Sequence, residues 1–201
     1  MRTAVVTLLS LVGLALLGAA AFVYAGFFNV GADDPHSPLV HAVLETARMR
    51  SIQTRAARIV VPAGYDTEEN VVSAAGHFAE HCATCHGTPA NKPDAFAEGM
   101  YPRPPSLTRA SEKYTPAELF WIMKHGIKMS GMPAMADDGD PMLWSTVAFV
   151  QRFPHLNGEG FNDLWGKAQA QSGKGHDMGK GGVAVPMPGS DASTAGHGHA
   201  K

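Results

Sequence analysis

Hydrophobic positions form one long uninterrupted run, followed by several amphipathic stretches. Residues 4–28 carry no charged side chain, and a helix needs about 20 apolar residues to cross the hydrocarbon core of a membrane. Arg2 precedes this run and Asp33 and Asp34 follow it, so the positive-inside rule exports everything downstream. A cleaved signal peptide would also export the chain, but its apolar region usually spans only about 7–15 residues. We therefore expect residues 1–30 to be an uncleaved transmembrane anchor.

The first amphipathic stretch predicts a helix that opens at Ser37 and Pro38. Serine is a favoured N-cap, and proline fits the first helical turn, where its missing N–H costs nothing. Apolar residues recur at helical spacing until Pro62 breaks the pattern. The basic residues leave three arrangements open, namely contact with anionic headgroups, packing on the exported domain, or solvation. We assign residues 31–65 to a juxtamembrane spacer with four arginines, Arg48, Arg50, Arg55 and Arg58.

Start and stop signals predict three further helices in the central part of the chain. Two of them begin with a capping box, in which the N-cap and a glutamate three residues later each bond to the backbone. No stretch alternates like a β-strand, so residues 66–156 are expected to form a small all-α domain of three principal helices with long loops. The signals are Asp66 with Glu69 for a helix running into Cys82, Thr115 with Glu118 for one stopping at Gly126, and Asp140 with Pro141 for one lasting until Pro154.

The C-terminal segment, residues 157–201, has the composition of a flexible tail. Eleven of the 22 glycines lie beyond Asn157, and few large apolar residues are present to offset the entropy of ordering the chain. We expect at most one short helix, over residues 162–170 with Asn162 as N-cap, and disorder beyond Gln171. Its potential ligands could capture copper or another divalent metal, although incidental residues of a solvated tail are the simpler interpretation. They are His176, Met178, Met187, His197 and His199.

Composition excludes two classes of protein. The chain carries 16 Lys+Arg against 18 Asp+Glu, a formal net charge of −2, whereas a nucleic-acid-binding protein needs a concentrated basic surface. Two cysteines are too few for a disulfide framework. Ten methionines and ten histidines are many potential soft and imidazole ligands for so short a chain.

Both cysteines lie in one Cys-x-x-Cys-His motif, formed by Cys82, Cys85 and His86. Two thiols at this spacing, at the end of a helix, reach the two vinyl groups along one edge of a porphyrin, and the following histidine then lies under the iron. The motif is therefore the attachment signal for a c-type haem. A covalent link also stabilises a domain that is too small to hold haem by its core alone.

Three other interpretations of the motif compete with haem. A thioredoxin-like dithiol needs strand–helix–strand context, and none is predicted. Zinc could take the two thiols with His77 and His81, but closed zinc sites usually draw paired ligands from two separated segments, and we expect these histidines on the outer face of their helix. A chance motif would leave an exported, unpaired dithiol, which is a liability.

The second axial ligand is expected on the loop between the third and fourth helices. This loop carries Met129, Met132 and Met135, and a thioether is a soft ligand that raises the haem potential. Gly131 lets the backbone approach the ring and Pro133 stiffens the loop, which favours Met132. Met129, Met135 and the imidazole of His125 remain the alternatives.

These motifs resemble class I cytochrome c, and more narrowly the membrane-anchored bacterial mono-haem group. The resemblance covers residues 66–154 and rests on the sequence from His81 to Gly87 and on the later Lys-His-Gly-Ile and Ser-Gly-Met-Pro-Ala segments. It implies a small fold of three principal helices around one covalently bound haem c. It further implies thioethers at Cys82 and Cys85, axial ligation by His86 and Met132, and a hydrogen bond from the His86 ring to the carbonyl of Pro105.

The resemblance also implies how the first and last helices of the domain pack. Family members place a glycine and an aromatic residue eight and four positions before the first cysteine. Phe78 matches the aromatic residue, but Ala74 stands where glycine is usual. Tyr101, Arg103 and Trp121 are implied as neighbours of the haem propionates.

A haem with both axial positions filled by protein has no free site for a substrate, so its natural activity is single-electron transfer. We therefore expect a single-pass protein of the inner membrane, not itself an enzyme, whose haem domain faces the periplasm and relays electrons between redox partners. The alternative is a haem-based sensor or peroxidase-like enzyme with a displaceable methionine. We expect no nucleic-acid partner and find no motif of a hydrolase or phosphate-binding loop.

Overall fold

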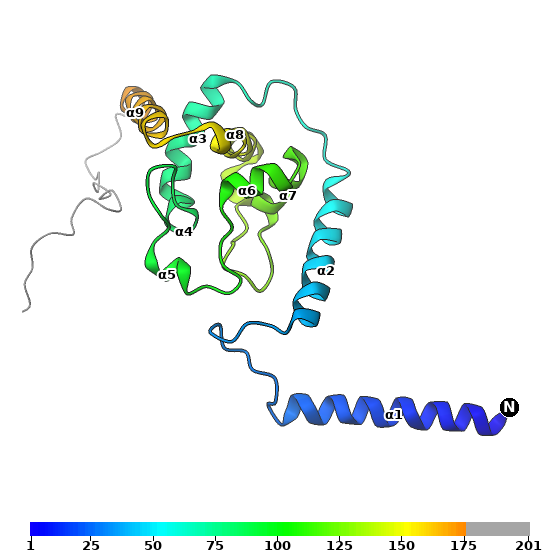
Figure 1. Ribbon diagram of the computed structural model, residues 1–201. Coiled ribbons are helices and arrows are strands. Elements are labelled where there is room, and N and C mark those ends of the chain that lie inside the picture. Colours follow the sequence, from blue (N-terminus) through cyan, green and yellow to red (C-terminus); the bar gives the residue numbers. More distant parts are fainter. Residues whose placement is uncertain (176–201) are drawn as a thin grey trace, which may run out of the picture. The chain divides into compact units, whose positions relative to one another are not determined.

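The computed structural model describes residues 1–175, and every regular element among them is a helix (Figure 1). The expected all-α fold is therefore confirmed. The described chain divides into two compact units, one spanning Met1–His36 and the other beginning at Ser37.

The first unit contains helix α1, Arg2–Tyr24. Its 23 residues rise about 35 Å at 1.5 Å per residue, which exceeds the roughly 30 Å of a hydrocarbon core. None of its side chains is buried. The helix is thus long and apolar enough to cross a membrane, a property that an N-terminal signal sequence shares.

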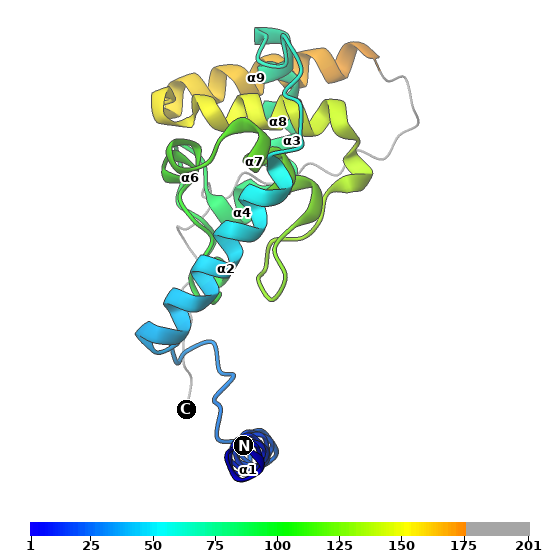
Figure 2. The same ribbon diagram turned by 90° about the vertical axis from the view of Figure 1, so that its right-hand side faces the viewer.

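The second unit begins with α2, Pro38–Ala56, whose start was predicted correctly. The hydroxyl of Ser37 accepts a hydrogen bond from the backbone N–H of Val40. Ile52 and Ala56 are buried, and α2 packs against α7, as Figure 2 shows. Of the three arrangements left open for this helix, the structure contains packing on the domain.

Helix α3, Glu68–His81, begins one residue later than its predicted cap implies. Thr67, not Asp66, is the N-cap, and its hydroxyl accepts from the N–H of Asn70. The expected capping box with Glu69 is therefore wrong, because the cap is displaced by one position. Instead, the side-chain amide of Asn70 donates to the carbonyl of Tyr65 at 2.9 Å and so holds the segment that precedes the helix against its first turn.

Helix α7, Pro116–His125, has the predicted capping box, in which Thr115 and Glu118 bond reciprocally. It ends at Gly126, whose φ of 62° is the left-handed conformation that favours glycine. Helix α8, Asp140–Arg152, also begins at the predicted place.

The proline-rich loop between α3 and α7 contains more helix than its sequence indicated. Proline and glycine interrupt the periodicity there, but three short helices form between the interruptions. The most important is α6, because it buries Leu107 and Ala110 in the core. The three helices are α4, Ala83–His86, α5, Ala95–Glu98, and α6, Leu107–Lys113, and two 3₁₀ turns follow later at Ala136–Asp138 and Phe153–His155.

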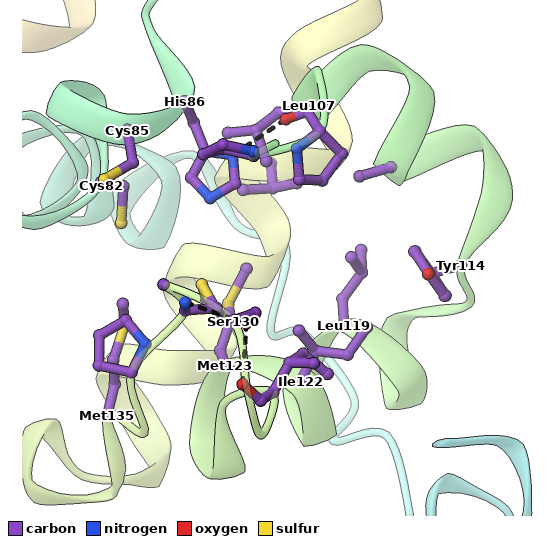
Figure 3. Close-up of a pocket in the computed structure, with 18 of the residues that line it drawn as sticks. Cys82, Cys85, His86, Leu107, Tyr114, Leu119, Ile122, Met123, Ser130 and Met135 are labelled. Carbon is purple, nitrogen blue, oxygen red and sulfur yellow. Dashed lines mark hydrogen bonds between the residues drawn. The ribbon is translucent and has the colours of Figure 1, made fainter. Parts of the chain in front are cut away.

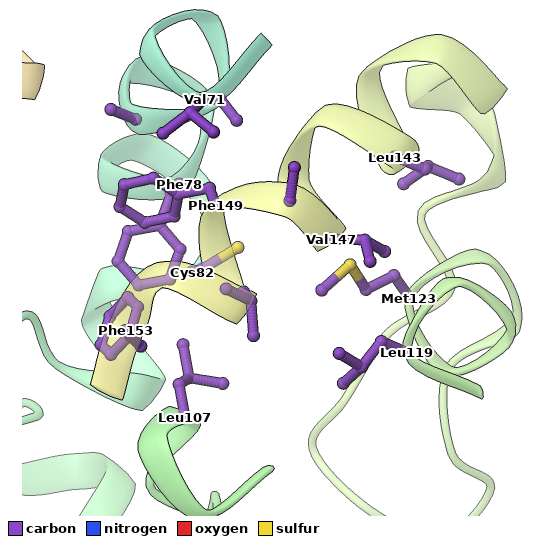
Figure 4. Close-up of a cluster of buried hydrophobic side chains, with 14 of the residues drawn as sticks. Val71, Phe78, Cys82, Leu107, Leu119, Met123, Leu143, Val147, Phe149 and Phe153 are labelled. Carbon is purple, nitrogen blue, oxygen red and sulfur yellow. The ribbon is translucent and has the colours of Figure 1, made fainter. Parts of the chain in front are cut away.

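The core is centred on the packing of α3 against α8 (Figure 4). The rings of Phe78 and Phe149 are 5.0 Å apart, and Phe78 also meets Phe153 edge-on at 5.3 Å. Ala74, at the position where glycine is usual, is completely buried. Trp144 stacks on Phe120 at 4.3 Å. Phe78, the aromatic residue that the resemblance singles out, thus packs on Phe149, while Trp144 joins α8 to α7.

The folded domain continues beyond the predicted boundary at residue 156. Helix α9 spans Gly158–Gly175, and it is capped by Asn157, whose side-chain oxygen accepts from the N–H of Gly160 at 2.8 Å, not by Asn162. This helix packs on α3. The expectation of a flexible segment from residue 157 was therefore wrong for this part, because three apolar side chains at helical spacing face the core. These are Phe161, Leu164 and Ala168; the possible metal ligands from His176 onward lie outside the described residues.

We predict that Leu164→Ala lowers the free energy of unfolding by about 2–4 kcal/mol, because it removes a buried side chain and leaves a cavity. Urea unfolding of the full chain provides the measurement. Asn162→Ala is the control, since Asn162 is exposed on the same helix. Equal stability of the two variants would contradict the assignment of α9 to the folded core.

Candidate functional site

One cavity collects side chains from α2, α3, α4, α6, α7, α8 and the loop before α8 (Figure 3). Its lining is mostly apolar and includes no aspartate or glutamate. Figure 3 places Cys82, Cys85 and His86 at one side of the cavity, with Met123, Ser130 and Met135 across from His86. The polar residues that line it are Arg48, His81, Arg103, Tyr114, Ser130 and Thr146, in addition to His86.

The two cysteines and His86 are presented by one continuous turn. The N–H of Cys82 bonds to Phe78 O at 2.9 Å and still belongs to α3, and the N–H of His86 bonds back to Cys82 O at 3.0 Å. Gly87 follows with a φ of 70°, and a Cβ there would lie 2.7 Å from the backbone oxygen of Asn91. Glycine is therefore required for the chain to turn away directly after His86.

Cys82 is buried, whereas Cys85 is half-buried, and neither forms a disulfide. Burial, with smaller effects from Asp138 and Cys85, raises the pKa of the Cys82 thiol to about 12. Cys82 is therefore a neutral, protonated thiol at physiological pH.

His86 is held in one orientation by the backbone. Its Nδ1–H donates to Pro105 O at 3.0 Å, which is the contact that the family resemblance implies. Burial lowers the pKa of the imidazole, and the hydrogen bond to Pro105 only partly opposes this. The ring is therefore neutral near pH 7, and because Nδ1 carries the proton, Nε2 has a free lone pair for a metal ion.

The loop across the cavity is closed by its own hydrogen bonds. The N–H of Ile127 bonds to Met132 O at 3.1 Å. The hydroxyl of Ser130 donates to Ile127 O at 2.8 Å and accepts from the N–H of Met132 at 3.2 Å. Met132 is half-buried and lines the cavity together with Met135. Met129 is 97% exposed and does not line it.

Comparison with protein families identifies the domain that contains this cavity. The model of a family described as cytochrome c oxidase, cbb3-type, subunit III matches residues 69–150. These residues form a class I c-type cytochrome domain. No curated protein and no solved structure matches the chain. A cytochrome c domain carries covalently bound haem c and transfers electrons to and from redox partners.

The residues of the cavity fit a covalently bound haem. Two thiols, a fixed imidazole nitrogen and thioether sulfurs surround an apolar space, and these are the donors that c-type haem uses. Arg48 and Arg103 supply positive charge at the lining. The lining thus offers an apolar surface for the macrocycle and two cationic side chains.

Several other predicted neighbours lie elsewhere. His125 is exposed, packs on Trp121 at 5.0 Å between ring centroids, and does not line the cavity. Tyr101 and Trp121 do not line it either, whereas Arg103 does. Of the three residues that were expected near the haem propionates, only Arg103 therefore lines the cavity.

The two histidines near the motif do not form a metal site. His77, which was expected on the outer face of α3, has only 11% of its side chain exposed and lies 3.2 Å from Asp138; burial lowers its pKa. The rings of His77 and His81 are 4.6 Å apart. Among residues 1–175, no group of three or more His, Cys, Asp or Glu side chains could hold a metal ion. The zinc interpretation has no support here.

Two groups of residues that line the cavity were not expected from the sequence. Met100 and Met123 are methionines outside the predicted ligand loop, and Arg48 and Ile52 belong to the helix that was assigned to a spacer. A signal for the second group was present, because Arg48, Ile52 and Ala56 are spaced by four residues and therefore share one face of α2.

We predict that Ser130→Ala speeds amide hydrogen exchange at Met132 about fivefold, since it removes a hydrogen bond worth about 1 kcal/mol. Ser111→Ala is a matched control, because the Ser111 hydroxyl also donates to the carbonyl three residues back at 2.8 Å, but on α6. Exchange at Met132 that is the same in both variants would show that Ser130 does not hold the loop.

Proposed function

We propose that this protein is a membrane-tethered c-type cytochrome that carries single electrons in the periplasm, with its haem iron held by His86 and Met132. The proposal rests chiefly on one observation. His86, oriented by Pro105 at 3.0 Å, lies across a largely apolar cavity from a self-closed, methionine-bearing loop. Such a cavity is suited to hold a planar macrocycle between an imidazole and a thioether.

Cys82 and Cys85 are the proposed attachment points. Both thiols line the cavity within one turn of His86. Addition of each thiol across a vinyl group of the haem forms a thioether without losing an atom, so the step needs no oxidant. The neutral state of the buried Cys82 thiol is compatible with this addition, because the proton that the vinyl carbon gains comes from the thiol.

Met132 is the best-supported distal ligand of the three candidate methionines. Both its N–H and its carbonyl are held by hydrogen bonds within the loop, to Ser130 and Ile127. Met129, in contrast, is almost completely exposed. Met135 lines the cavity, but its N–H is bonded to Met123 O at 3.1 Å, which ties it to α7 instead of to the loop.

A haem held in this way suits electron transfer better than substrate chemistry. With His86 and Met132 as its protein ligands, a bound haem iron would change its oxidation state without exchanging a ligand. The mostly apolar lining offers few dipoles that would reorient when the charge changes. The soft thioether favours ferrous iron and raises the potential.

Helix α1 supports a tether, since it is long and apolar enough to span a membrane. Arg2 before it and the two aspartates after it favour an anchor in the inner membrane with the haem domain on the periplasmic side. Tethering raises the effective concentration of the cytochrome near membrane-bound donors and acceptors. The name of the matching family, that of an oxidase subunit, supports a partner of the respiratory or dehydrogenase class.

We predict that Cys82→Ala combined with Cys85→Ala abolishes haem-dependent staining on a denaturing gel, because no covalent link to the haem remains. His81→Gln is the control, since His81 also lines the cavity and adjoins Cys82 but is not an attachment point. Staining that survives the double substitution would disprove covalent attachment at this motif.

We predict that Met132→Ala produces a high-spin haem that binds carbon monoxide when reduced, because one axial position becomes open. The wild-type protein should show the red-region charge-transfer band of methionine-bound ferric haem and should not bind carbon monoxide. Met129→Ala and Met135→Ala are the matched controls and should keep the band. If one of them loses it instead, the distal assignment is wrong, and carbon monoxide binding by the wild type would favour a sensor or peroxidase-like function.

A further inference from the structure

We infer that Arg48, on the helix that precedes the cytochrome domain, binds a haem propionate and so makes α2 part of the haem site. The inference rests on the proposed function, because it requires haem in the described cavity. Arg48 lies outside residues 69–150, the segment that matches the cytochrome family, so the family match does not assign it a role.

The packing of α2 brings Arg48 to the cavity. One turn further along the helix, Ile52 is only 1% exposed and lines the same cavity. Two turns along, Ala56 is buried as well. The three residues form one face of α2, and this face is turned toward the domain. The position of Arg48 at the lining is therefore fixed by buried apolar contacts.

One buried nitrogen of the Arg48 guanidinium lacks a hydrogen-bond partner among residues 1–175. Its Nη2 pairs with the carboxylate of Glu45, but its Nε is buried and has no hydrogen-bond partner within the part of the chain that the structure describes. A buried N–H of an ionised group is costly to leave unpaired. A carboxylate is the acceptor that matches this group best, because guanidinium and carboxylate pair with two parallel hydrogen bonds.

Among the described residues, no aspartate or glutamate lines the cavity, so they provide no carboxylate acceptor there. Haem brings two carboxylates into an otherwise apolar space, and each needs a cationic or N–H partner. A propionate oxygen therefore supplies the acceptor that the Nε of Arg48 lacks. Arg48 in turn supplies the positive charge that a propionate in this cavity needs.

The other arginines of α2 are engaged differently. Arg55 donates to the Ser51 hydroxyl at 2.8 Å, and its guanidinium lies 6.0 Å from the centre of the Trp121 ring. Arg50 is exposed and is 3.5 Å from the Gln53 side chain. Neither of them lines the cavity. Arg103 does, but its side chain is exposed and no unpartnered buried nitrogen marks it.

Glu45 holds Arg48 in place from the solvent side. It also accepts from Lys113 of α6 at 2.9 Å, so it bridges α2 and α6. Burial raises the pKa of Glu45, but the hydrogen bond to Lys113 and the charge of Arg48 outweigh this and keep the pKa below its ordinary value. Glu45 is therefore ionised at neutral pH. Glu45 pairs with Arg48, and Lys113 of α6 and His41 of α2 act on Glu45 in turn. The other charged or titratable groups that line the same cavity are His81, Cys82, Cys85, His86, Arg103 and Tyr114.

The test is the haem midpoint potential of the full chain in detergent, measured between about pH 5 and pH 8. In the wild type we expect little pH dependence, because Arg48 keeps the propionate ionised. Arg48→Gln should lower the potential near pH 8, since a positive charge near the iron favours reduction. It should also move the inflection of the potential to a pH that is higher by about 1–3 units, as expected for a carboxylate that loses an arginine partner.

Two further variants separate this electrostatic effect from a purely structural one. Arg50→Gln removes an exposed arginine of the same helix and should behave like the wild type. Glu45→Gln weakens the contact of Glu45 with Arg48 and Lys113, and so the link between α2 and α6. It also removes a negative charge, so it should shift the potential upward. If Arg48 acted only by docking α2, then Glu45→Gln and Arg48→Gln would shift the potential in the same direction.

Arg48→Lys covers the case in which Arg48→Gln fails to accumulate with haem. An ammonium keeps the charge but lacks the planar pair of donors, so the potential near pH 8 should be retained while the pH of the inflection rises. A wild-type inflection in Arg48→Lys, or identical titrations of Arg48→Gln and Arg50→Gln, would overturn the inference. If the wild-type chain itself lacks covalent haem or the methionine band, the proposed function fails. This outcome is distinct from a failure of the inference about Arg48, because it is measured on the wild type alone.

Discussion

The packing of α3 against α8 is the contact on which the site depends. Phe78 lies one helical turn before Cys82, is completely buried against Phe149, and also lines the cavity. Because the Cys-x-x-Cys-His turn continues directly from α3, the direction in which the two thiols and His86 point is set by how α3 crosses α8. Fixing this one helix pair therefore fixes one wall of the haem cavity.

The opposite wall is built by a different means. Its loop is closed by backbone and Ser130 hydrogen bonds, and Gly126 can adopt its left-handed conformation with no Cβ to meet Pro133 at 2.6 Å. One wall thus rests on aromatic burial and the other on local hydrogen bonds. Helix α2 closes a third side with Arg48 and Ile52, which joins the segment after the proposed anchor to the cofactor site.

Local signals in the sequence predicted most elements and the central motif. The capping box at Thr115 and Glu118 was correct because both partners lie within four residues. The cap of α3 was displaced by one residue because Asp66 and Thr67 are both good N-caps, and the contact of Asn70 with Tyr65 favours the second. Helix α9 was shortened in the prediction because the segment after Asn157 is rich in glycine, while three spaced apolar residues decide the burial of the helix.

The sequence by itself determined the attachment motif, the apolar α1 segment and the methionine-bearing loop, because each depends on residues that are close together in the chain. Only the tertiary structure decided which side chains meet. It turned Met129 outward, brought Pro105 to His86 across 19 positions, and laid Arg48 against the cavity. Such contacts depend on how whole helices pack, and burial of apolar faces constrains that packing without leaving a local pattern around any one polar residue.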